Sequence, residues 1–531
     1  LTNVNGALMA IEGARDGVAT VMSNINTLQA YASTNNCTIL NDGSVVGEGS
    51  RTQRGGKSPA RLNIEQGIKD VIEQADQVDT DLYHALQDIN NDSYTDGDWA
   101  ENKVIGVPDL PQPNWSPSQN AAWWNSLPDD RKQFFTDHCP DTVRHLDGLP
   151  AAARDRANRF ALEGYVDANG KEQPGALADA KEAVKDAQKE YDDARKHLSA
   201  YEPRSGHMNS EERVAREKLE RAKVAYEDLK TIQKQIANAD RMNKGLAPAY
   251  LLDFNYDEKY QRTTAIVSAG NPDTATHVST LVPGIGTNVR GDLDYYMDFN
   301  DRLREQTKHA GVDPNNVAAI SYLGYVAPKN QGFDKVQAAD IGYANRAAPK
   351  LAQFEEGLRA SANANNHKFT NTLLTHSYGS TTGGKSATLM APGTVDRLIL
   401  AGSPGAGADT IDAYNVSREH VYVSSIPTSD AVQDLNTFTP SGFGSDPRYL
   451  DGITHLSGDV TDSENYVPPR VPPIDDNPLI HQAYRFVHAL DHHMAYFDEN
   501  TRTSQDFANI VAGGNPTTDE EWAAIKAARG K

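Results

Sequence analysis

The chain is 531 residues long, enough for about three domains of ordinary size. Acidic side chains outnumber basic ones by 73 to 51, and the formal net charge of −22 argues against a nucleic-acid backbone or an anionic membrane surface as partner. The apolar content of 38% and the mean hydropathy of −0.62 are low for one compact enzyme and predict long solvated helices.

No run of about 18 apolar residues occurs, so no membrane-spanning segment is expected. We see no signal peptide, but the chain opens at Leu1 within a helical pattern, which fits a trimmed start. A secreted, cell-envelope or cytoplasmic location therefore stays open. The two cysteines, Cys37 and Cys139, have no closely spaced Cys/His partners, so no metal site and no disulfide framework are expected. One disulfide between them and two unrelated thiols both remain open.

Residues 1–91 are predicted to be an N-terminal helical hairpin region. Apolar residues recur at helical spacing over 1–32 and 60–90, and the glycine- and serine-rich stretch 41–57 between them is predicted to be a loop. Residues 92–118 are polar and proline-rich, which is typical of a linker.

Residues 119–175 are predicted to form short helices around the pair Trp123 and Trp124. This pair is interpreted as a core anchor rather than a binding surface. Residues 176–245 are predicted to be an antiparallel coiled-coil hairpin, because apolar residues alternate spacings of three and four along both halves. Its charges are interpreted as a solvated face, with a partner-docking arm as the alternative.

Residues 246–531 are predicted to be an α/β domain of the α/β-hydrolase type, with a mostly parallel sheet. The expected strands are 250–255, 262–268, 277–282, 317–323, 369–375, 395–401, 420–425 and, more weakly, 452–457. The expected helices are 291–310, 335–363, 379–390 and 504–512. The first two strands have little room between them for a crossover, so we expect an antiparallel pair there.

The stretch around Ser377 has the outline of a nucleophile elbow. An apolar run ends at Thr375, Ser377 follows two residues later, and small residues then lead into a segment that can be helical. A sharp strand-to-helix turn of this kind lifts a serine hydroxyl clear of the sheet and points a helix N-terminus at it.

An acid and a histidine follow Ser377 in the order expected for an α/β-hydrolase triad. Asp430 comes after the seventh predicted strand, and His493 lies in a late loop. In such a triad the histidine removes the serine proton and the aspartate orients the imidazole. Each assignment has rivals in the sequence: Asp434 and Asp446 for the acid, and His481, His488 and His492 for the base.

Two backbone N–H groups would stabilise the oxyanion. One is that of Tyr378, directly after the nucleophile, and the other is that of Ile285, in a glycine-rich loop after an early strand. No metal or cofactor is implied by this set of residues.

The segment Gly379–Ser386 also satisfies the phosphate-loop pattern of glycine, four residues, glycine, lysine and serine. On that alternative Lys385 would contact phosphates and Ser386 would hold Mg²⁺. The pattern follows the fifth strand rather than an early one, and no later apolar strand ends in the aspartate that would orient the metal. We therefore favour the hydrolase interpretation.

Several motifs together resemble an actinobacterial α/β-hydrolase family, long described as a domain of unknown function. The motifs lie at Pro283–Asn288, Tyr322–Pro328, His376–Ser380 and His493–Phe497, and the resemblance extends upstream to Trp123–Trp124 and to Leu146–Arg159. The resemblance covers roughly residues 245 to 515. The N-terminal helices are also similar to helical-hairpin domains linked to type VII secretion in the same bacteria.

The resemblance implies a serine hydrolase that acts on an ester or amide, with Ser377 as nucleophile, Asp430 as acid and His493 as base. It implies a small-molecule or lipid acyl substrate without defining it, and the helical N-terminal region suits a protein partner. Two positions depart from the family pattern: Thr375 stands where the elbow usually has glycine, and Asp430 is followed by alanine rather than proline. A hydrolase fold that has lost catalysis and serves as an interaction module stays the alternative.

Overall fold

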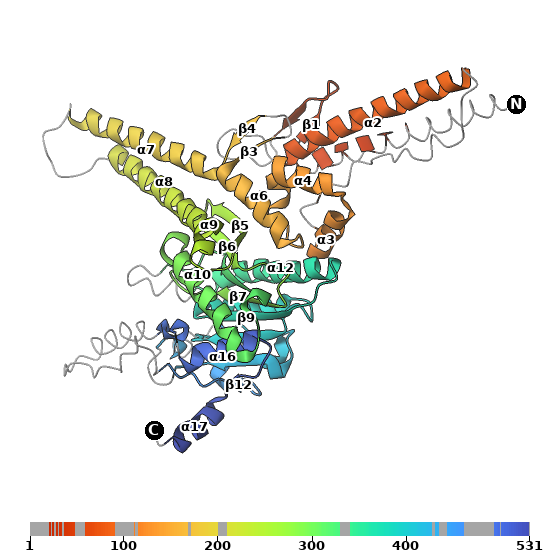
Figure 1. The fold of residues 1–531 in the computed structure, drawn as a ribbon. Coiled ribbons are helices and arrows are strands. Elements are labelled where there is room, and N and C mark those ends of the chain that lie inside the picture. The colour runs from red at the N-terminus through yellow and green to blue at the C-terminus, as the bar shows by residue number, and fades with distance from the viewer. Residues whose placement is uncertain are drawn as a thin grey trace. The chain divides into compact units, whose positions relative to one another are not determined.

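The structure is a computed structural model, and it describes most of the chain. The described residues are 18, 21–22, 24–25, 28–29, 31–33, 35, 37–47, 59–90, 111, 115–167, 171–199, 210–329, 340–426, 431–434, 443–460, 493–499 and 501–529. They divide into two compact units, which we treat separately (Figure 1). Unit 1 comprises Leu1–Trp115, Trp123–Val143 and Val166–Glu172, and unit 2 comprises Ser116–Ala122, Arg144–Tyr165 and Gln173–Lys531.

Unit 1 is mainly helical, as the periodicity predicts. Its helices are α2 (Pro59–Asn90), α4 (Asp129–His138) and α5 (Pro140–Val143), and α3 (Pro117–Ser126) bridges the sequence ranges of both units. Trp123 and Trp124 are buried, and the Trp123 ring lies 5.3 Å from that of Phe135. Trp123 and its neighbour therefore lie in the core, as the core-anchor interpretation expected.

A short β-hairpin in unit 1 falls partly within the stretch predicted to be a loop. Strands β1 (Cys37–Ile39) and β2 (Val45–Gly47) pair in antiparallel fashion. The Asp42 carboxylate accepts the N–H of Ser44 at 2.9 Å, and Gly43 has a φ of +80°. An Asp-Gly pair between two apolar triplets is a hairpin signal, and our sequence interpretation overlooked it. Cys37 and Cys139 are both buried free thiols, so they do not form a disulfide.

Unit 2 is built on an eight-stranded sheet whose order is β12-β11-β10-β9-β7-β8-β6-β5. The strands are β5 (Ala249–Asp257), β6 (Arg262–Ala269), β7 (His277–Val282), β8 (Val317–Leu323), β9 (Thr370–His376), β10 (Arg397–Ala401), β11 (Val421–Ser424) and β12 (Thr454–His455). The expected antiparallel pair is β5 with β6, and β6 also runs antiparallel to β8. The other pairings are parallel. The predicted mostly parallel α/β sheet is confirmed.

Helices cover both faces of this sheet. On one face, α10 (Val289–Gln306) and α16 (Arg502–Val511) share a buried cluster with the sheet. On the other face, α12 (Gly342–Ala364) and α13 (Tyr378–Leu389) contribute Leu351, Phe354 and Ala387 to a second cluster. A short C-terminal helix, α17 (Asp519–Ala528), was not predicted, and its described side chains are at least partly exposed.

The upstream motif at Leu146–Arg159 belongs structurally to this sheet. Helix α6 (Ala151–Glu163) lies along the edge strand β5 and offers it polar side chains. The Asp155 carboxylate accepts the N–H of Leu251 at 2.7 Å, and Asn158 Nδ2 donates to the Leu251 carbonyl at 3.1 Å. Because these side chains satisfy backbone groups that an edge strand leaves unpaired, α6 protects the edge of the sheet. The short strands β3 (Gly164–Val166) and β4 (Glu172–Pro174) follow it.

The predicted helical hairpin consists of α7 (Ala176–Ser199) and α8 (Ser210–Gln235), followed by α9 (Asn238–Asn243). Lys218 on α8 forms an ion pair with Glu190 on α7 at 2.5 Å. The end of α8 enters the core of the sheet domain, where Leu229 and Ile232 are buried beside α10. The base of the hairpin is thus part of unit 2.

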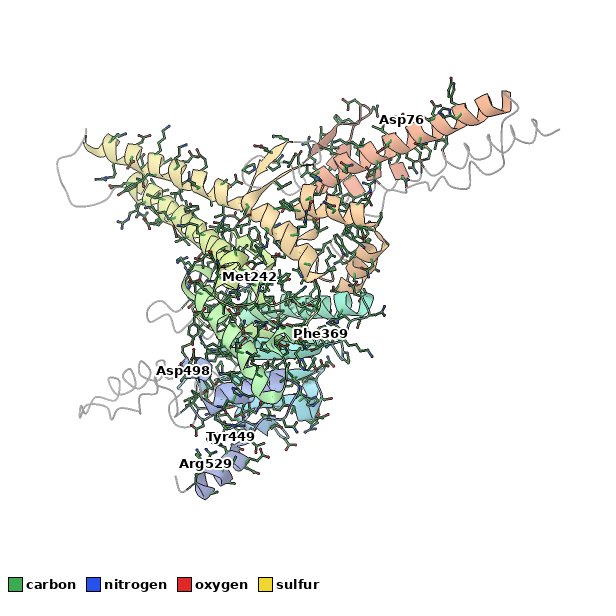
Figure 2. The ribbon with its side chains drawn as sticks, viewed as in Figure 1. Asp76, Met242, Phe369, Tyr449, Asp498 and Arg529 are labelled. Atoms are coloured by element: carbon green, nitrogen blue, oxygen red, sulfur yellow. The ribbon has the colours of Figure 1, made fainter. Side chains whose placement is uncertain are left out.

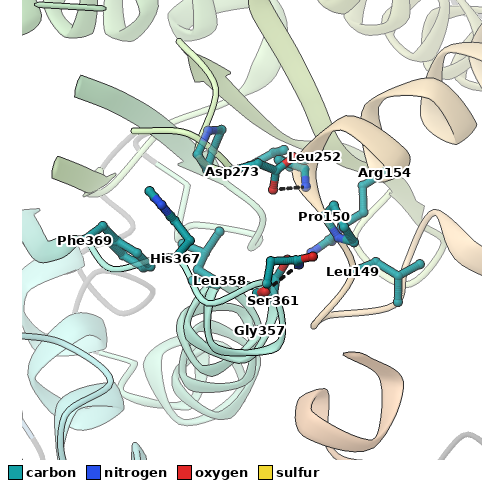
Figure 3. Close-up of a pocket in the computed structure, with 14 residues that line it drawn as sticks. Leu149, Pro150, Arg154, Leu252, Asp273, Gly357, Leu358, Ser361, His367 and Phe369 are labelled. Atoms are coloured by element: carbon teal, nitrogen blue, oxygen red, sulfur yellow. Dashed lines mark hydrogen bonds between the residues drawn. The ribbon is translucent and has the colours of Figure 1, made fainter. Parts of the chain in front are cut away.

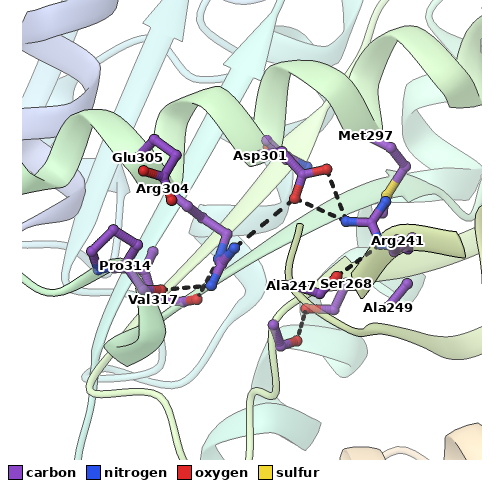
Figure 4. Close-up of polar contacts among 12 residues, drawn as sticks. Arg241, Ala247, Ala249, Ser268, Met297, Asp301, Arg304, Glu305, Pro314 and Val317 are labelled. Atoms are coloured by element: carbon purple, nitrogen blue, oxygen red, sulfur yellow. Dashed lines mark hydrogen bonds and ion pairs between the residues drawn. The ribbon is translucent and has the colours of Figure 1, made fainter. Parts of the chain in front are cut away.

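A buried ion network links α9 to α10 (Figure 4). Arg241 Nη2 donates to both carboxylate oxygens of Asp301 at 2.8 Å, and both side chains are 7% exposed. Arg304 Nε donates to the Val317 carbonyl at 2.8 Å, one turn further along α10. Buried charges of this kind are tolerated because each finds a partner, and they fix how α9 and α10 approach the sheet.

A buried carboxyl group lies between α12 and the sheet. Glu355 is fully buried, and its Oε2 accepts a hydrogen bond from Asn371 Nδ2 at 2.8 Å. Burial raises the pKa of Glu355 from 4.5 to about 7, although the hydrogen bond from Asn371 lowers it. Folding at mildly acidic pH therefore takes up a proton at this group.

We expect Glu355→Gln to remove a pH dependence from the stability of unit 2. The pKa is higher in the folded state than in the unfolded state, so the free energy of unfolding should be greatest below pH 4.5, fall between pH 4.5 and 7, and stay lower above pH 7. The neutral variant should gain about 3 kcal/mol over the wild type above pH 7 and little below pH 4.5. Urea unfolding at pH 4, 6 and 8 measures this difference, with Glu356→Gln, a partly exposed neighbour, as control. An equal effect of Glu355→Gln at all three pH values would contradict the assignment.

Some large apolar side chains among the described residues remain exposed. Tyr449 is 81% exposed and Met242 is 63% exposed, and they lie far apart along the chain (Figure 2). Such isolated residues are normal on a protein surface. Among the described residues, we find no helix that is both long and apolar enough to cross a bilayer.

Candidate active site

Ser377 occupies a strained turn between β9 and α13. Strand β9 ends at His376, α13 begins at Tyr378, and Ser377 between them has φ +58° and ψ −134°. Its N–H donates to the Ala401 carbonyl of the neighbouring strand at 2.9 Å. A serine with positive φ costs roughly 1–3 kcal/mol, and such strain is concentrated at functional sites. The local geometry is therefore that of the predicted nucleophile elbow.

Two glycines allow other backbone segments to approach this turn closely. A Cβ at Gly284 would lie 2.7 Å from Ser377 Oγ, and one at Gly379 would lie 2.6 Å from the Pro283 carbonyl oxygen. Any larger side chain at either position would separate the Pro283–Thr287 loop from the turn. The loop and the serine thus lie in direct contact.

The unusual Thr375 is accommodated by a third glycine. The Thr375 hydroxyl donates to the Ile399 carbonyl at 2.6 Å, and its methyl group points at Gly383 on α13. A Cβ at Gly383 would collide with that methyl group. Thr375 has a side chain where the family pattern has glycine. It fits because the residue that faces it on α13, Gly383, has none.

The phosphate-loop alternative is wrong, because the whole segment Gly379–Ser386 is helical. The N–H groups that would surround a phosphate lie within α13, and Ser386 is fully buried. Gly384 has a different purpose, because a Cβ there would collide with the Ala406 carbonyl. The glycines in the pattern serve close packing of α13.

His493 lies close to the residue that precedes the nucleophile. The Nε2–H of His376 donates to the His493 carbonyl at 2.8 Å, and the two rings are 4.4 Å apart. His493 is buried. Its rivals His481, His488 and His492 lie outside the described residues. The structure therefore brings the predicted base next to the predicted elbow.

Asp430 lies outside the described residues, but both flanks of its loop are described. Ile426 follows β11, and the Ile426 N–H donates to the Tyr496 hydroxyl at 3.0 Å. Gln433, on the other flank, donates through Nε2 to the same hydroxyl at 3.2 Å. The two described flanks of Asp430 are thus both bonded to the segment that contains His493.

The rival acid Asp446 already has a structural function. It caps a short helical turn by accepting the N–H of Arg448 at 2.9 Å, and it pairs with the Arg448 guanidinium at 2.7 Å. Arg448 in turn donates to the Gln433 carbonyl at 2.9 Å. Only the backbone of the other rival, Asp434, is described; it ends the turn Ala431–Asp434.

The predicted oxyanion donors lie on the two segments that meet at Ser377. Tyr378 starts α13, and the Ile285 side chain packs against a cluster that includes Tyr378 and Phe443. Two contacts hold the loop in place: Tyr325 Oη donates to the Pro283 carbonyl at 2.5 Å, and the Gly286 N–H donates to the Pro328 carbonyl at 2.8 Å.

Sequence reasoning did not find the tyrosines around the site. The Tyr378 hydroxyl donates to the Asp340 carbonyl at 2.5 Å and accepts the N–H of Ala344. Burial raises the pKa of both Tyr378 and Tyr325 well above the usual value for tyrosine. Both are therefore neutral donors at physiological pH and serve to position backbone. Tyr325 lies within the motif Tyr322–Pro328, but nothing in the neighbouring sequence indicates its contact with Pro283.

A cavity of about 240 Å³ lies apart from this site (Figure 3). It is lined by Leu149, Arg154, Asp273, Ser361, His367 and Phe369, among others. Residues 367–369 directly precede β9, whereas Ser377 follows it, so the cavity lies at the opposite edge of the sheet. Its Asp273 carboxylate is engaged in capping α6, because it accepts the N–H groups of Ala151 and Ala152. Within the described part of the chain, no group of three or more His, Cys, Asp or Glu side chains is arranged to hold a metal.

Comparison with known proteins agrees with this architecture. A family model described as Alpha/beta hydrolase matches residues 258–440, about a third of the chain. The fold is that of an α/β hydrolase. This match includes the elbow and both segments predicted to supply oxyanion donors, and it ends before His493.

Two curated relatives are described as uncharacterized proteins. Two proteins from Mycobacterium tuberculosis, of strains CDC 1551 and H37Rv, are each 25% identical over 321 residues. The match covers 60% of this chain and 44% of each relative, so it spans less than half of their length. Among solved structures, LpqC, a poly(3-hydroxybutyrate) depolymerase from Bordetella parapertussis, is 16% identical over 54% of this chain and 98% of its own. Its TM-score of 0.25 is too low to carry an argument.

Proposed function

We propose that this protein is a serine hydrolase that transfers an acyl group from an ester or amide to water. The nucleophile is Ser377, the base His493 and the acid Asp430, with the N–H groups of Tyr378 and Ile285 as oxyanion donors. The observation that carries the proposal is the strained φ of +58° at Ser377, in a turn that touches the Pro283–Thr287 loop. A serine that merely capped a helix would not need this conformation.

The reaction would proceed in two halves. His493 accepts the proton of the Ser377 hydroxyl while Oγ attacks the acyl carbon, and the tetrahedral oxyanion lies between the two N–H donors. The imidazolium then protonates the leaving alcohol or amine, and an acyl-enzyme remains. Water attacks that ester with His493 again as base, releasing the acid and restoring Ser377.

The positions of the segments support these assignments. His493 is held by His376, the direct neighbour of the nucleophile, at 2.8 Å. Ile426 and Gln433, which flank Asp430 in the sequence, both donate to the hydroxyl of Tyr496, three residues after His493. Ser377, His493 and the two described flanks of Asp430 all follow the carboxyl ends of strands or contact residues that do, which supports a triad at that edge of the sheet. The substrate proposed is a small-molecule or lipid acyl compound.

A fluorophosphonate probe tests the proposal, because labelling requires an activated serine and not merely an exposed one. The wild type is expected to label, and His493→Ala to label at least about 10²-fold more slowly. Lys385→Ala should label like the wild type, since Lys385 belongs to the helical segment that resembles a phosphate loop. A folded wild type that fails to label would refute the hydrolase proposal and favour the interaction-module alternative.

A further inference from the structure

The segment that follows β8 contacts the Pro283–Thr287 loop on both sides of Ile285. Tyr325 Oη donates to the Pro283 carbonyl at 2.5 Å, and the Gly286 N–H donates to the Pro328 carbonyl at 2.8 Å. We call Tyr325 and Pro328 the brace. The N–H of Ile285 belongs to the peptide group between these two contacts. Because the brace holds the chain before and after that peptide group, it fixes the direction in which the N–H points.

The braced carbonyl lies against the helix that starts at the nucleophile. A Cβ at Gly379, the second residue of α13, would lie 2.6 Å from the Pro283 carbonyl oxygen, and one at Gly284 would lie 2.7 Å from Ser377 Oγ. An oxyanion donor must lie within about 3 Å of the oxygen that develops the charge. A small shift of the loop at Pro283 would therefore change the distance that matters in the transition state.

The Tyr325 hydroxyl is polar in a place where packing alone would favour a phenyl ring. Tyr325 is 8% exposed and belongs to the apolar cluster that contains Val282 and Phe354. Phenylalanine would fill almost the same volume without a hydroxyl that must find a partner. Burial raises the pKa of Tyr325 well above the usual value for tyrosine, and the nearby Thr382 side chain lowers it only in part, so the hydroxyl stays a donor.

The brace is attached to two neighbouring strands of the sheet. Tyr325 comes two residues after β8, every residue of which is buried. Arg262, the first residue of β6, donates through Nη1 to the Ala327 carbonyl at 3.2 Å, and β6 pairs with β8. A functional group that is held by rigid strands is placed more precisely than one on an unsupported loop.

We propose that Tyr325 is a positioning residue that directs the N–H of Ile285 toward the oxyanion formed at Ser377. The inference rests on the proposed function, because it assumes that Ser377 attacks an acyl carbon. Tyr325 does not touch the reacting atoms on this account and acts through the Pro283 carbonyl. The inference is independent of which carboxylate completes the triad.

The variant Tyr325→Phe keeps the ring and removes the donor. The loop then loses one of its two contacts with the brace. We expect the rate constant for acylation by p-nitrophenyl butyrate to fall about 10-fold, less than the 10²- to 10³-fold that complete loss of an oxyanion donor typically costs. The ester concentration that half-saturates acylation should change by less than about twofold, because the oxyanion exists only in the transition state. Pre-steady-state ester hydrolysis measures both quantities.

Inhibition by phenylboronic acid gives a second readout that a merely structural effect would not move in the same way. An activated serine adds reversibly to boron, and the tetrahedral adduct resembles the transition state of acylation. In Tyr325→Phe the inhibition constant should rise by about the factor by which acylation slows. A general loss of stability, or of ester binding, would not produce this parallel.

Tyr414→Phe is the matched control. Tyr414 is 5% exposed in the same cluster, and its hydroxyl donates to the Ala406 carbonyl at 2.6 Å. Ala406 packs against Gly384, further along α13 from Ser377. This variant also leaves a buried carbonyl without its donor, so a similar loss of stability is expected. Its acylation rate and boronate inhibition should stay at the wild-type level.

A second variant covers the case in which Tyr325→Phe fails to fold, which thermal unfolding would reveal. Arg262→Met removes the contact with the Ala327 carbonyl and loosens the same segment from β6. We expect acylation about 3-fold slower, with the same parallel rise in the boronate inhibition constant. Wild-type acylation in a folded Arg262→Met protein would then overturn the inference.

The outcomes separate the two claims. If the wild type is acylated at Ser377 and Tyr325→Phe reacts at the wild-type rate, Tyr325 has no positioning role and the hydrolase proposal stands. If Tyr325→Phe and Tyr414→Phe slow acylation equally, or if the boronate inhibition constant does not follow the rate, the inference is wrong. If the wild type forms no acyl-enzyme at Ser377, the proposed function fails, and the inference falls with it.

Discussion

Replacing Ser377 by alanine is expected to lower the turnover of acyl esters by about 10⁴- to 10⁶-fold and to reduce fluorophosphonate labelling to background. The variant loses the only atom that forms the covalent bond in the proposed reaction. Its stability should change little, because a positive φ strains alanine and serine alike. Hydrolysis of p-nitrophenyl esters measures the turnover, and thermal unfolding measures the stability.

Ser380→Ala is the control for that experiment. Ser380 lies one helical turn further on, is fully buried, and donates through Oγ to the Ala401 carbonyl at 3.2 Å. Its loss should cost about 1 kcal/mol of stability and leave turnover nearly intact. If Ser380→Ala abolished activity and Ser377→Ala did not, the assignment of the nucleophile would be wrong.

Gly284→Ala is expected to have the second largest effect, a loss of about 10²- to 10³-fold in turnover. The new methyl group would collide with the Ser377 side chain, lying 2.7 Å from its Oγ. Relief of that collision requires the Pro283–Thr287 loop to move, and the N–H of Ile285 moves with it. The loss should therefore appear in the rate constant for acylation, which pre-steady-state ester hydrolysis measures.

The control for this variant is Gly514→Ala. The atom nearest to a Cβ at Gly514 is the Asn509 carbonyl oxygen, at 3.2 Å, just beyond the end of α16. A small effect on acylation is expected there. Acylation rates that remain at the wild-type level in Gly284→Ala would show that the Pro283–Thr287 loop does not supply an oxyanion donor.

The sheet could be predicted because its strands carry a local signal. Every residue of β8 and β10 is buried, so the apolar run in the sequence marks the strand directly. Each candidate residue could then be placed by the predicted strand that precedes it in the sequence. The elbow at Ser377 was predictable for the same reason, since a strand end and a helix start enclose it.

Contacts between distant segments could not be predicted in this way. The hydroxyl of Tyr496 and the amide of Gln433 are 63 positions apart, and neither has a spacing that marks the other. The fit of Thr375 against Gly383 likewise turned a departure from the family pattern into a matched pair only once α13 was placed. The phosphate-loop pattern is a chance match, because glycines that allow close packing of α13 stand at its positions.

Mass mapping of the fluorophosphonate adduct on the wild-type protein tests the central claim most directly. The account predicts one adduct per chain, on the peptide that carries Ser377. An adduct on another serine, or a folded protein that forms none, would contradict the claim that Ser377 is an activated nucleophile.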